Sequence, residues 1–166
     1  LGGISRDFEG NYVAGDSNYV VVEADEYDRS FLHLAPKYAV VLSTDPDHLD
    51  IYGDHANMLE TGFRAFAKGM KTGGHLIVRH DVVDHFQGID HVTISTVGIG
   101  RGDYCAQNIR VEDGAFHFDL CEPNGHLITD IRTSLPGRHN VENAVAACAI
   151  TRLAGGTEAA LKEGLS

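Results

Sequence analysis

The stretch "KYAVVLSTDPDHLD" (residues 37–50) decides the fold, because an unbroken apolar run leads directly into a cluster of acids and a histidine. An earlier stretch, "NYVVVEAD" (18–25), repeats this design. Continuous β-branched runs without polar alternation are typical of parallel strands that are covered on both faces. We therefore expect both stretches to be strands of one parallel sheet, with polar groups at their carboxyl ends.

Strand–helix–strand alternation continues along the chain. Between residues 57 and 70 apolar side chains recur at helical spacing, which predicts a helix with one buried stripe. "HLIVRH" (75–80) and "HVTISTVG" (91–98) read as two further strands, separated by a short helix. This alternation predicts an α/β fold, a mostly parallel sheet flanked by helices.

The pattern changes after residue 100. Two turn signals, Asp113-Gly114 and Asn124-Gly125, are each flanked by alternating residues, and this predicts a separate small antiparallel three-stranded sheet over residues 100–134. "LPGRHNVENAVAACAITRLAGG" (135–156) then restores a helix that ends at a glycine pair, and another helix begins after it.

Composition limits the function classes. The 166 residues suit about one domain, and the formal charge of −11 argues against nonspecific binding to nucleic acid or to an anionic membrane surface. No stretch approaches the ~20 apolar residues that a membrane span needs, so we expect no membrane insertion. Three widely spaced cysteines without a C-x-x-C pattern predict free thiols in a reducing cytoplasm.

Two acid clusters follow the two strands of the opening pattern. Glu23, Asp25 and Glu26 end the first, and Asp47 with His48 follows the second. Ligands of open α/β sheets bind beyond the carboxyl ends of the strands, and Mg²⁺ needs only one or two protein oxygens beside substrate phosphates. The same acids also suit turns and helix caps, and histidine is an atypical Mg²⁺ ligand. On the residues alone, a metal-bearing cleft and an ordinary acidic turn both stay open.

A third candidate site is "PGRHNVENA" at the start of the 135–156 helix. Asn140 and Asn143 are three residues apart, so their amides project to the same side. An amide that donates and accepts in parallel matches the N6/N7 edge of adenine, whereas the alternative is a helix cap with a solvent-facing partner. The 166 residues contain neither a G-x-x-x-x-G-K-[ST] phosphate loop nor a G-x-S-x-G elbow.

Taken together, "VVEADEYDRSFLHLAPKYAVVLSTDPDHLDIYG" and "LPGRHNVENAVAACAI" resemble the central ATP-binding domain of the Mur ligases. The resemblance covers nearly the whole chain, with three separated motifs in the family's order. The pattern is most similar to the branch that joins L-alanine to UDP-N-acetylmuramate. The branch that attaches a recycled murein tripeptide is the nearest alternative, and folylpolyglutamate-type synthetases, which share the fold, rank lower.

The resemblance implies a mechanism and a set of site residues. ATP would phosphorylate the muramoyl carboxylate, and the amine of the amino acid would attack the resulting acyl phosphate, with Mg²⁺ neutralising charge. Glu23 and His48 match the family's two magnesium-binding positions. The nucleotide-binding matches are His139, Asn140 and Asn143, and the residues implied on the muramoyl side are Asp25, Glu26 and Ser30.

The resemblance also implies how the domain is organised. We expect residues 1–166 to be part of a central domain, with 1–99 and 135–166 as its α/β core and 100–134 as the antiparallel meander. A phosphate loop, a UDP-binding N-terminal domain and a C-terminal domain are expected outside the chain, so the chain alone should be inactive. Lys68, the one lysine between residues 57 and 70, is not expected to match the family's carbamylated lysine.

Two readings from other classes remain. The chain could be a metal-dependent hydrolase that uses Glu23, Asp47 and His48, or a non-catalytic binding module. The ligase hypothesis predicts that changing Glu23 or His48 abolishes most of the turnover of the whole protein, whereas the binding-module hypothesis predicts no effect.

Overall fold

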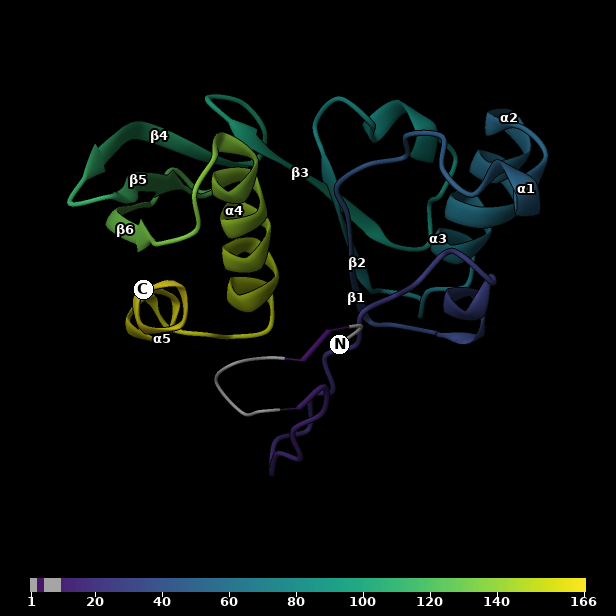
Figure 1. The fold of residues 1–166 in the computed structure, drawn as a ribbon, viewed down its shortest axis with the longest axis horizontal. Coiled ribbons are helices and arrows are strands. Elements are labelled where there is room, and N and C mark those ends of the chain that lie inside the picture. Colours follow the sequence, from purple (N-terminus) through teal and green to yellow (C-terminus); the bar gives the residue numbers. More distant parts are fainter. Residues whose placement is uncertain (1–2, 5–9) are drawn as a thin grey trace.

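The computed structural model describes residues 3–4 and 10–166, in which six strands form one sheet in the order β1-β2-β3-β4-β5-β6 (Figure 1). The first four strands pair in parallel, and β4, β5 and β6 pair antiparallel. The strands are β1 (Tyr38–Val41), β2 (His75–Arg79), β3 (Thr93–Ile99), β4 (Tyr104–Glu112), β5 (Ala115–Cys121) and β6 (Leu127–Thr133). The predicted α/β fold with a mostly parallel sheet is confirmed.

Helices cover both faces of the parallel strands. Leu76 and Val78 of β2 pack into a cluster with the helices that follow β1, whereas Ile77 between them packs under the long helix of the C-terminal part. The unbroken apolar runs are thereby explained, because successive side chains of one strand enter two different cores. The helical segments are η1 (Ser30–His33), α1 (Leu49–Tyr52), α2 (His55–Met58), η2 (Leu59–Arg64), α3 (Ala65–Lys68), η3 (Val83–Phe86), α4 (Arg138–Leu153) and α5 (Glu158–Leu165).

The predicted helix of residues 57–70 is observed as α2, η2 and α3, which follow one another without a break. The side chain of Asp54 caps its start by accepting a hydrogen bond from the backbone N–H of Asn57 at 2.8 Å. The central segment η2 is a π-helix, and a Cβ on its Gly62 would lie 3.1 Å from the Tyr52 ring. The glycine therefore lets this helix lie directly against Tyr52.

The predicted separate antiparallel sheet is wrong in one respect. The three strands are present, but β4 also pairs in parallel with β3, so the hairpins extend the main sheet. Parallel neighbours usually need a long crossover, whereas here four residues suffice because only three register pairs form. Gly102 adopts a φ of 107° in this loop, and Asp103 accepts hydrogen bonds from the N–H and hydroxyl of Thr96 at 2.7 and 2.8 Å.

The predicted strand at residues 18–25 is not observed. The segment carries no strand pairing, and Val20 and Val21 are 85% and 96% exposed. It lies beside the outer edge of β1, where the Tyr19 and Tyr38 rings are 6.4 Å apart. β-branched residues favour strands only when a neighbouring strand pairs with them, and β1 pairs on its other side with β2. The prediction that residues 18–25 form a strand of the sheet is therefore wrong.

The helix predicted at 135–156 is observed as α4, with Ala144, Val145, Cys148 and Ala149 buried on one face. The helix after it, α5, is capped by the Thr157 hydroxyl, which accepts from the N–H of Ala160 at 3.2 Å. Among the described residues no helix combines the length and the apolar character that crossing a bilayer requires.

Candidate functional site

The chain between β1 and α1 begins with an anchored turn. Ser43 and Asp45 bond to each other, with the Ser43 hydroxyl donating to Asp45 Oδ2 at 2.7 Å. Thr44 between them is 2% exposed, and its hydroxyl lies 2.8 Å from His85 Nδ1. Its carbonyl oxygen lies 2.7 Å from His55 Nε2. The contacts of Ser43 and Thr44 therefore hold this loop in place before the chain reaches His48.

His48 lies at the start of α1 in a left-handed conformation, with a φ of 52°. Its backbone N–H donates to Asp47 Oδ1 at 2.7 Å. Its imidazole faces two carboxylates: Nδ1 is 3.7 Å from Asp47 Oδ1, and Nε2 is 3.8 Å from Glu26 Oε1. The Tyr27 ring meets the imidazole edge-on at 5.0 Å between centroids. The imidazole is therefore oriented on two sides while about a third of it stays exposed.

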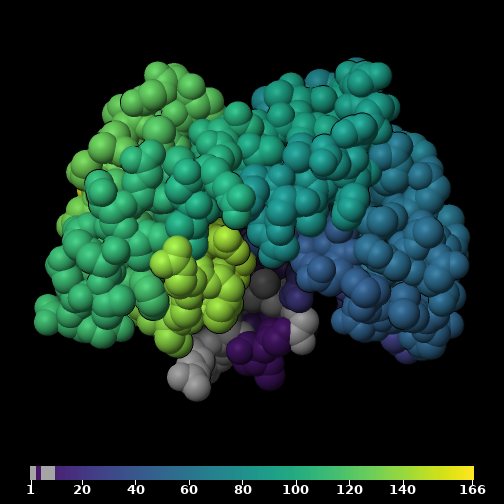
Figure 2. Space-filling view, turned by 90° about the horizontal axis from the view of Figure 1, so that it is seen from above, coloured from purple at the N-terminus to yellow at the C-terminus, as the bar shows by residue number. Residues whose placement is uncertain are grey.

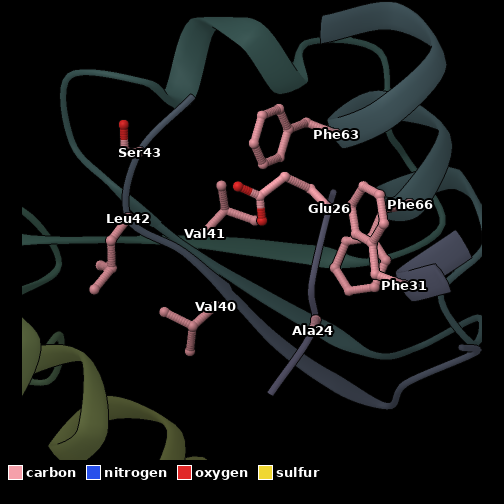
Figure 3. Close-up of a pocket in the computed structure, with 9 residues that line it drawn as sticks. All are labelled: Ala24, Glu26, Phe31, Val40, Val41, Leu42, Ser43, Phe63 and Phe66. Carbon is pink, nitrogen blue, oxygen red and sulfur yellow. The ribbon is translucent and has the colours of Figure 1, made fainter. Parts of the chain in front are cut away.

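Glu26, a member of the acid cluster at residues 23–26, lies close to His48. Its carboxylate points into a cavity of about 160 Å³ between this segment, β1 and the helix of residues 55–68 (Figure 3). Ser43 and the rings of Phe31 and Phe63 also line this cavity. The cavity thus combines apolar walls with one carboxylate and one hydroxyl at the rim where β1 ends.

Tyr52 and Arg29 connect the segment that contains Glu26 to the segment that contains His48. The Tyr52 hydroxyl donates to the backbone carbonyl of Glu26 at 2.8 Å, and burial raises the pKa of this phenol. The Arg29 guanidinium lies 4.8 Å above the Tyr52 ring and donates to the carbonyl of Ile51 at 3.4 Å. Sequence reasoning missed both residues as parts of the site, although Tyr52 belongs to the quoted "DHLDIY".

The neighbouring acids of the first cluster shape its turn. Asp25 Oδ1 accepts from the N–H of Tyr27, and Asp28 Oδ1 accepts from the N–H of Ser30, both at 2.9 Å. Hydrogen bonds from Ser30 hold the pKa of the exposed Asp28 below its ordinary value. Asp25 and Ser30 therefore have a structural role in this turn, and their predicted contact with substrate stays a prediction.

Glu23 lies three residues before Glu26, in the exposed extended segment beside β1. Within the first acid cluster, Glu26 lies 3.8 Å from the His48 imidazole. The predicted role of Glu23 as a metal ligand remains a prediction, and Glu26 joins it as a candidate from the same acid run.

The start of α4 presents the third predicted motif. Asn143 Nδ2 donates to Asn140 Oδ1 at 3.3 Å, and Asn140 Nδ2 donates to the carbonyl of Pro136 at 2.7 Å. The two amides therefore do share one side of the helix. The His139 ring lies against Gly137, whose φ is 100° and where a Cβ would lie 2.6 Å from that ring. The glycine is what allows the ring to fold back over the helix start.

Arg79 lies at the same edge of the sheet as the loop that follows β1. It ends β2 and forms a bidentate pair with Asp81 at 2.6 and 2.9 Å. Hydrogen bonding to Asp81 is the main cause that raises its pKa, and Glu142 of α4 and Asp45 after β1 add to the rise. Figure 2 looks down on this edge and shows a hollow between the yellow-green residues of α4 and the blue residues that follow β1. A charged residue at the end of an otherwise apolar strand was the signal that could have identified Arg79.

Comparison with known proteins gives these features a context. The family described as Mur ligase middle domain matches residues 10–151. A UDP-N-acetylmuramate–L-alanine ligase from Christiangramia forsetii is 45% identical over 90% of this chain and 31% of its own length. The chain therefore spans about a third of the length of the curated relatives it matches.

Solved structures show the same fold. The UDP-N-acetylmuramate–alanine ligase of Thermotoga maritima superposes with a TM-score of 0.78 at 24% identity, covering 99% of this chain and 36% of that one. The UDP-N-acetylmuramate:L-alanyl-γ-D-glutamyl-meso-diaminopimelate ligase of Neisseria meningitides gives 0.77 at 24% identity, covering 99% and 55%. At this level of identity the two structures establish the fold and do not separate the two activities.

Proposed function

The chain belongs to the Mur ligase family, and from that premise we propose that it supplies the nucleotide-binding part of an enzyme that joins L-alanine to UDP-N-acetylmuramate with ATP. One observation carries the proposal. Glu26 and His48 come from two loops and meet where β1 ends, at the same edge as the Arg79 end of β2 and near the Glu142 turn of α4. Ligands of open α/β sheets bind at this edge.

The nucleotide would lie against the start of α4. The side-by-side amides of Asn140 and Asn143 can donate to and accept from the edge of adenine, with His139 adjacent. The positive end of the helix dipole at the start of α4 favours negative charge nearby. Arg79, oriented by its bidentate pair with Asp81, places a guanidinium at the carboxyl end of β2.

The donor set at His48 fits a magnesium ion that is also bound by phosphate. The described residues hold no group of three His, Cys, Asp or Glu side chains that could bind a metal by themselves. Magnesium, however, takes one or two protein carboxylates and completes its octahedron with water and phosphate oxygens. Glu26 and Asp47 would hold it beside His48, with Glu23 as the further predicted ligand. When bound, the ion neutralises charge that develops on the transferred phosphoryl group.

The remaining residues keep this arrangement in place. Tyr52 and Arg29 bind the backbone of both loops, so that the distance between Glu26 and His48 does not depend on flexible side chains alone. The carboxylates of Glu26 and Asp47 lie on either side of the imidazole and help to orient it towards the strand ends. The protein thus contributes positioning and charge complementarity, which dominate phosphoryl transfer.

A peptide acceptor is the alternative, because the fold alone does not separate the two ligases. The TM-scores of 0.78 and 0.77 are nearly equal for the alanine ligase and for the ligase that uses L-alanyl-γ-D-glutamyl-meso-diaminopimelate. The 45% identity to an L-alanine ligase favours the single amino acid.

The test is substrate-dependent release of ADP by the whole protein that carries this chain. With Mg·ATP, we expect ADP to form only when UDP-N-acetylmuramate and L-alanine are both present, with the tripeptide as a poorer acceptor. Better turnover with the tripeptide would favour the peptide acceptor. Phosphate release that is unaffected by omitting UDP-N-acetylmuramate would contradict the ligase and favour the metal-dependent hydrolase.

A further inference from the structure

Cys105 and Cys121 lie directly opposite each other on the antiparallel strands β4 and β5. Side chains of directly opposed residues point to the same face of a sheet, and their Cα atoms are about 4.5–5.5 Å apart. That separation lies within the ~4.4–6.8 Å range over which a disulfide can form. Their wide spacing in the sequence predicts free thiols, and the fold brings two of them to opposed positions.

The pair lies on the face of the sheet away from α4. The next residues on each strand, Ala106 and Leu120, belong to the core cluster beneath α4, and side chains alternate between faces. Cys105 is 7% exposed and Cys121 is half-buried, so one thiol is more accessible than its partner. Gln107 Nε2 donates to Cys105 Sγ at 3.6 Å.

The two thiols are also close enough for Cys105 to affect the pKa of Cys121. Burial is the main cause that raises the pKa of the Cys121 thiol, and the adjacent Cys105 raises it further through charge and a side-chain hydrogen bond. Both cysteines are free in the structure. The site is thus a reduced dithiol whose sulfurs are neighbours.

We propose that Cys105 and Cys121 form a reversible modification site, an oxidation-sensitive dithiol that small disulfides such as oxidised glutathione convert into a cross-strand disulfide. The proposal is independent of the ligase function. It rests on the register of β4 and β5 and on the unequal exposure of the two thiols.

The chemistry balances in two exchange steps. The more exposed Cys121 loses its proton, its thiolate attacks one sulfur of oxidised glutathione, and one glutathione thiolate leaves with the bonding electrons. Cys105 then loses its proton and attacks Cys121 Sγ, which forms the Cys105–Cys121 bond and expels the second glutathione. The protein loses two protons and two electrons, and one small disulfide becomes two thiols.

The link would lie at the junction between the two halves of the sheet. Cys105 also pairs with Gly98 of β3, so it belongs both to the parallel ladder and to the hairpin. A disulfide here would fix the hairpin where it leaves the parallel strands. Because the pKa of Cys121 is raised, the reactive thiolate is scarce at neutral pH, and oxidation should be faster at pH 9 than at pH 7.

The test is intact-mass spectrometry of the chain after exposure to oxidised glutathione, followed by peptide mapping. We expect a loss of two hydrogens, a linked peptide pair containing Cys105 and Cys121, and full reversal by dithiothreitol. Cys148 is the internal control, because burial raises its pKa to about 12 and it should stay reduced.

The variant Cys105→Ser isolates the first step. Without the resolving thiol, Cys121 should retain one glutathionyl group as a stable mixed disulfide. If the wild-type chain instead keeps a stable mixed disulfide at Cys121, or stays fully reduced while its denatured form reacts, the proposal is wrong.

Discussion

Each half of the sheet holds a histidine beside a carboxylate, but the two pairs differ in geometry and position. In the antiparallel half, His117 Nδ1 lies 2.8 Å from Asp130 Oδ1, and Arg110 contacts the same carboxylate. In the parallel half, His48 lies 3.7 and 3.8 Å from its two acids, at the end of β1. The tighter network is satisfied by its own members, whereas the looser one keeps donors and acceptors available for a ligand. Position at the strand ends, not tightness of pairing, identifies the site.

The halves also differ in how they are covered. The parallel strands are buried on both faces, while β6 alternates between buried and exposed residues because only one face meets α4 and α5. A sheet buried on both faces leaves only its strand ends and edge for binding. We therefore expect a ligand to bind at the rim that the loops after β1 and β2 form with the start of α4.

The largest expected effect is a loss of stability, and it tests whether helices cover both faces of β2 but only one face of β6. Leu76→Ala and Ile77→Ala, adjacent on β2, should each lower the free energy of unfolding by about 2–5 kcal/mol, because each side chain is fully buried in its own core. On β6, Ile128→Ala should cost as much, but its exposed neighbour Thr129→Ala should stay within about 0.5 kcal/mol. Urea denaturation measures all four.

If Thr129→Ala destabilises the chain as much as Ile128→Ala does, the antiparallel half is covered on both faces and the comparison fails.

The same distinction explains what the sequence could predict. The strands β1, β2 and β3 and the helix α4 were predicted because their apolar patterns directly reflect which faces are buried. The strand predicted at 18–25 was wrong, because a β-branched pattern indicates extended chain but does not say whether a partner strand is present. The single sheet was missed because the β3–β4 pairing depends on a four-residue loop with no common sequence signature.

The positions of the candidate residues in the fold were predicted, whereas their roles in a site stay predictions. His48 and the asparagine pair of α4 lie at one edge of the sheet, as their positions after a strand and at a helix start suggested. The partner of His48 could not be chosen among Glu23, Asp25 and Glu26, because the choice depends on the turn that Tyr52 fixes from 26 positions away. Contacts over such separations follow from the fold and not from local pattern.

The next effect compares asparagines in the two halves. In the whole protein, Asn143→Ala should raise the KM for ATP about tenfold, because one lost polar contact to adenine is worth roughly 1–1.5 kcal/mol. Asn124→Ala, in the turn between β5 and β6, is the matched control and should leave the KM for ATP unchanged. Steady-state kinetics with varied ATP distinguish them.

An unchanged KM for ATP in the Asn143→Ala variant would show that the adenine does not bind at the start of α4.

The smallest effect concerns acid stability. Hydrogen bonding to Arg79 holds the pKa of Asp81 below its ordinary value, so the pair stabilises the fold above about pH 4 and loses this contribution as the pH falls through the lowered pKa. Asp81→Asn should therefore reduce stability at about pH 6 and flatten its decline towards pH 3. His117 likewise lowers the pKa of the exposed Asp130, where salt should screen the effect.

Melting curves between these pH values, with and without added salt, separate the two carboxylates. A decline that Asp81→Asn leaves as steep as in the wild-type chain would rule out this pair as its cause.

The most direct measurement of the central claim is the turnover of the whole protein after His48→Ala and after His117→Ala. The loosely paired His48 at the end of β1 should cost at least ~10² in kcat, on the scale of groups that stabilise charge during reaction. The tightly paired His117 should change kcat less than about twofold, and both variants should keep a folded circular dichroism spectrum. Equal losses for the two variants, or full activity of His48→Ala, would contradict the account.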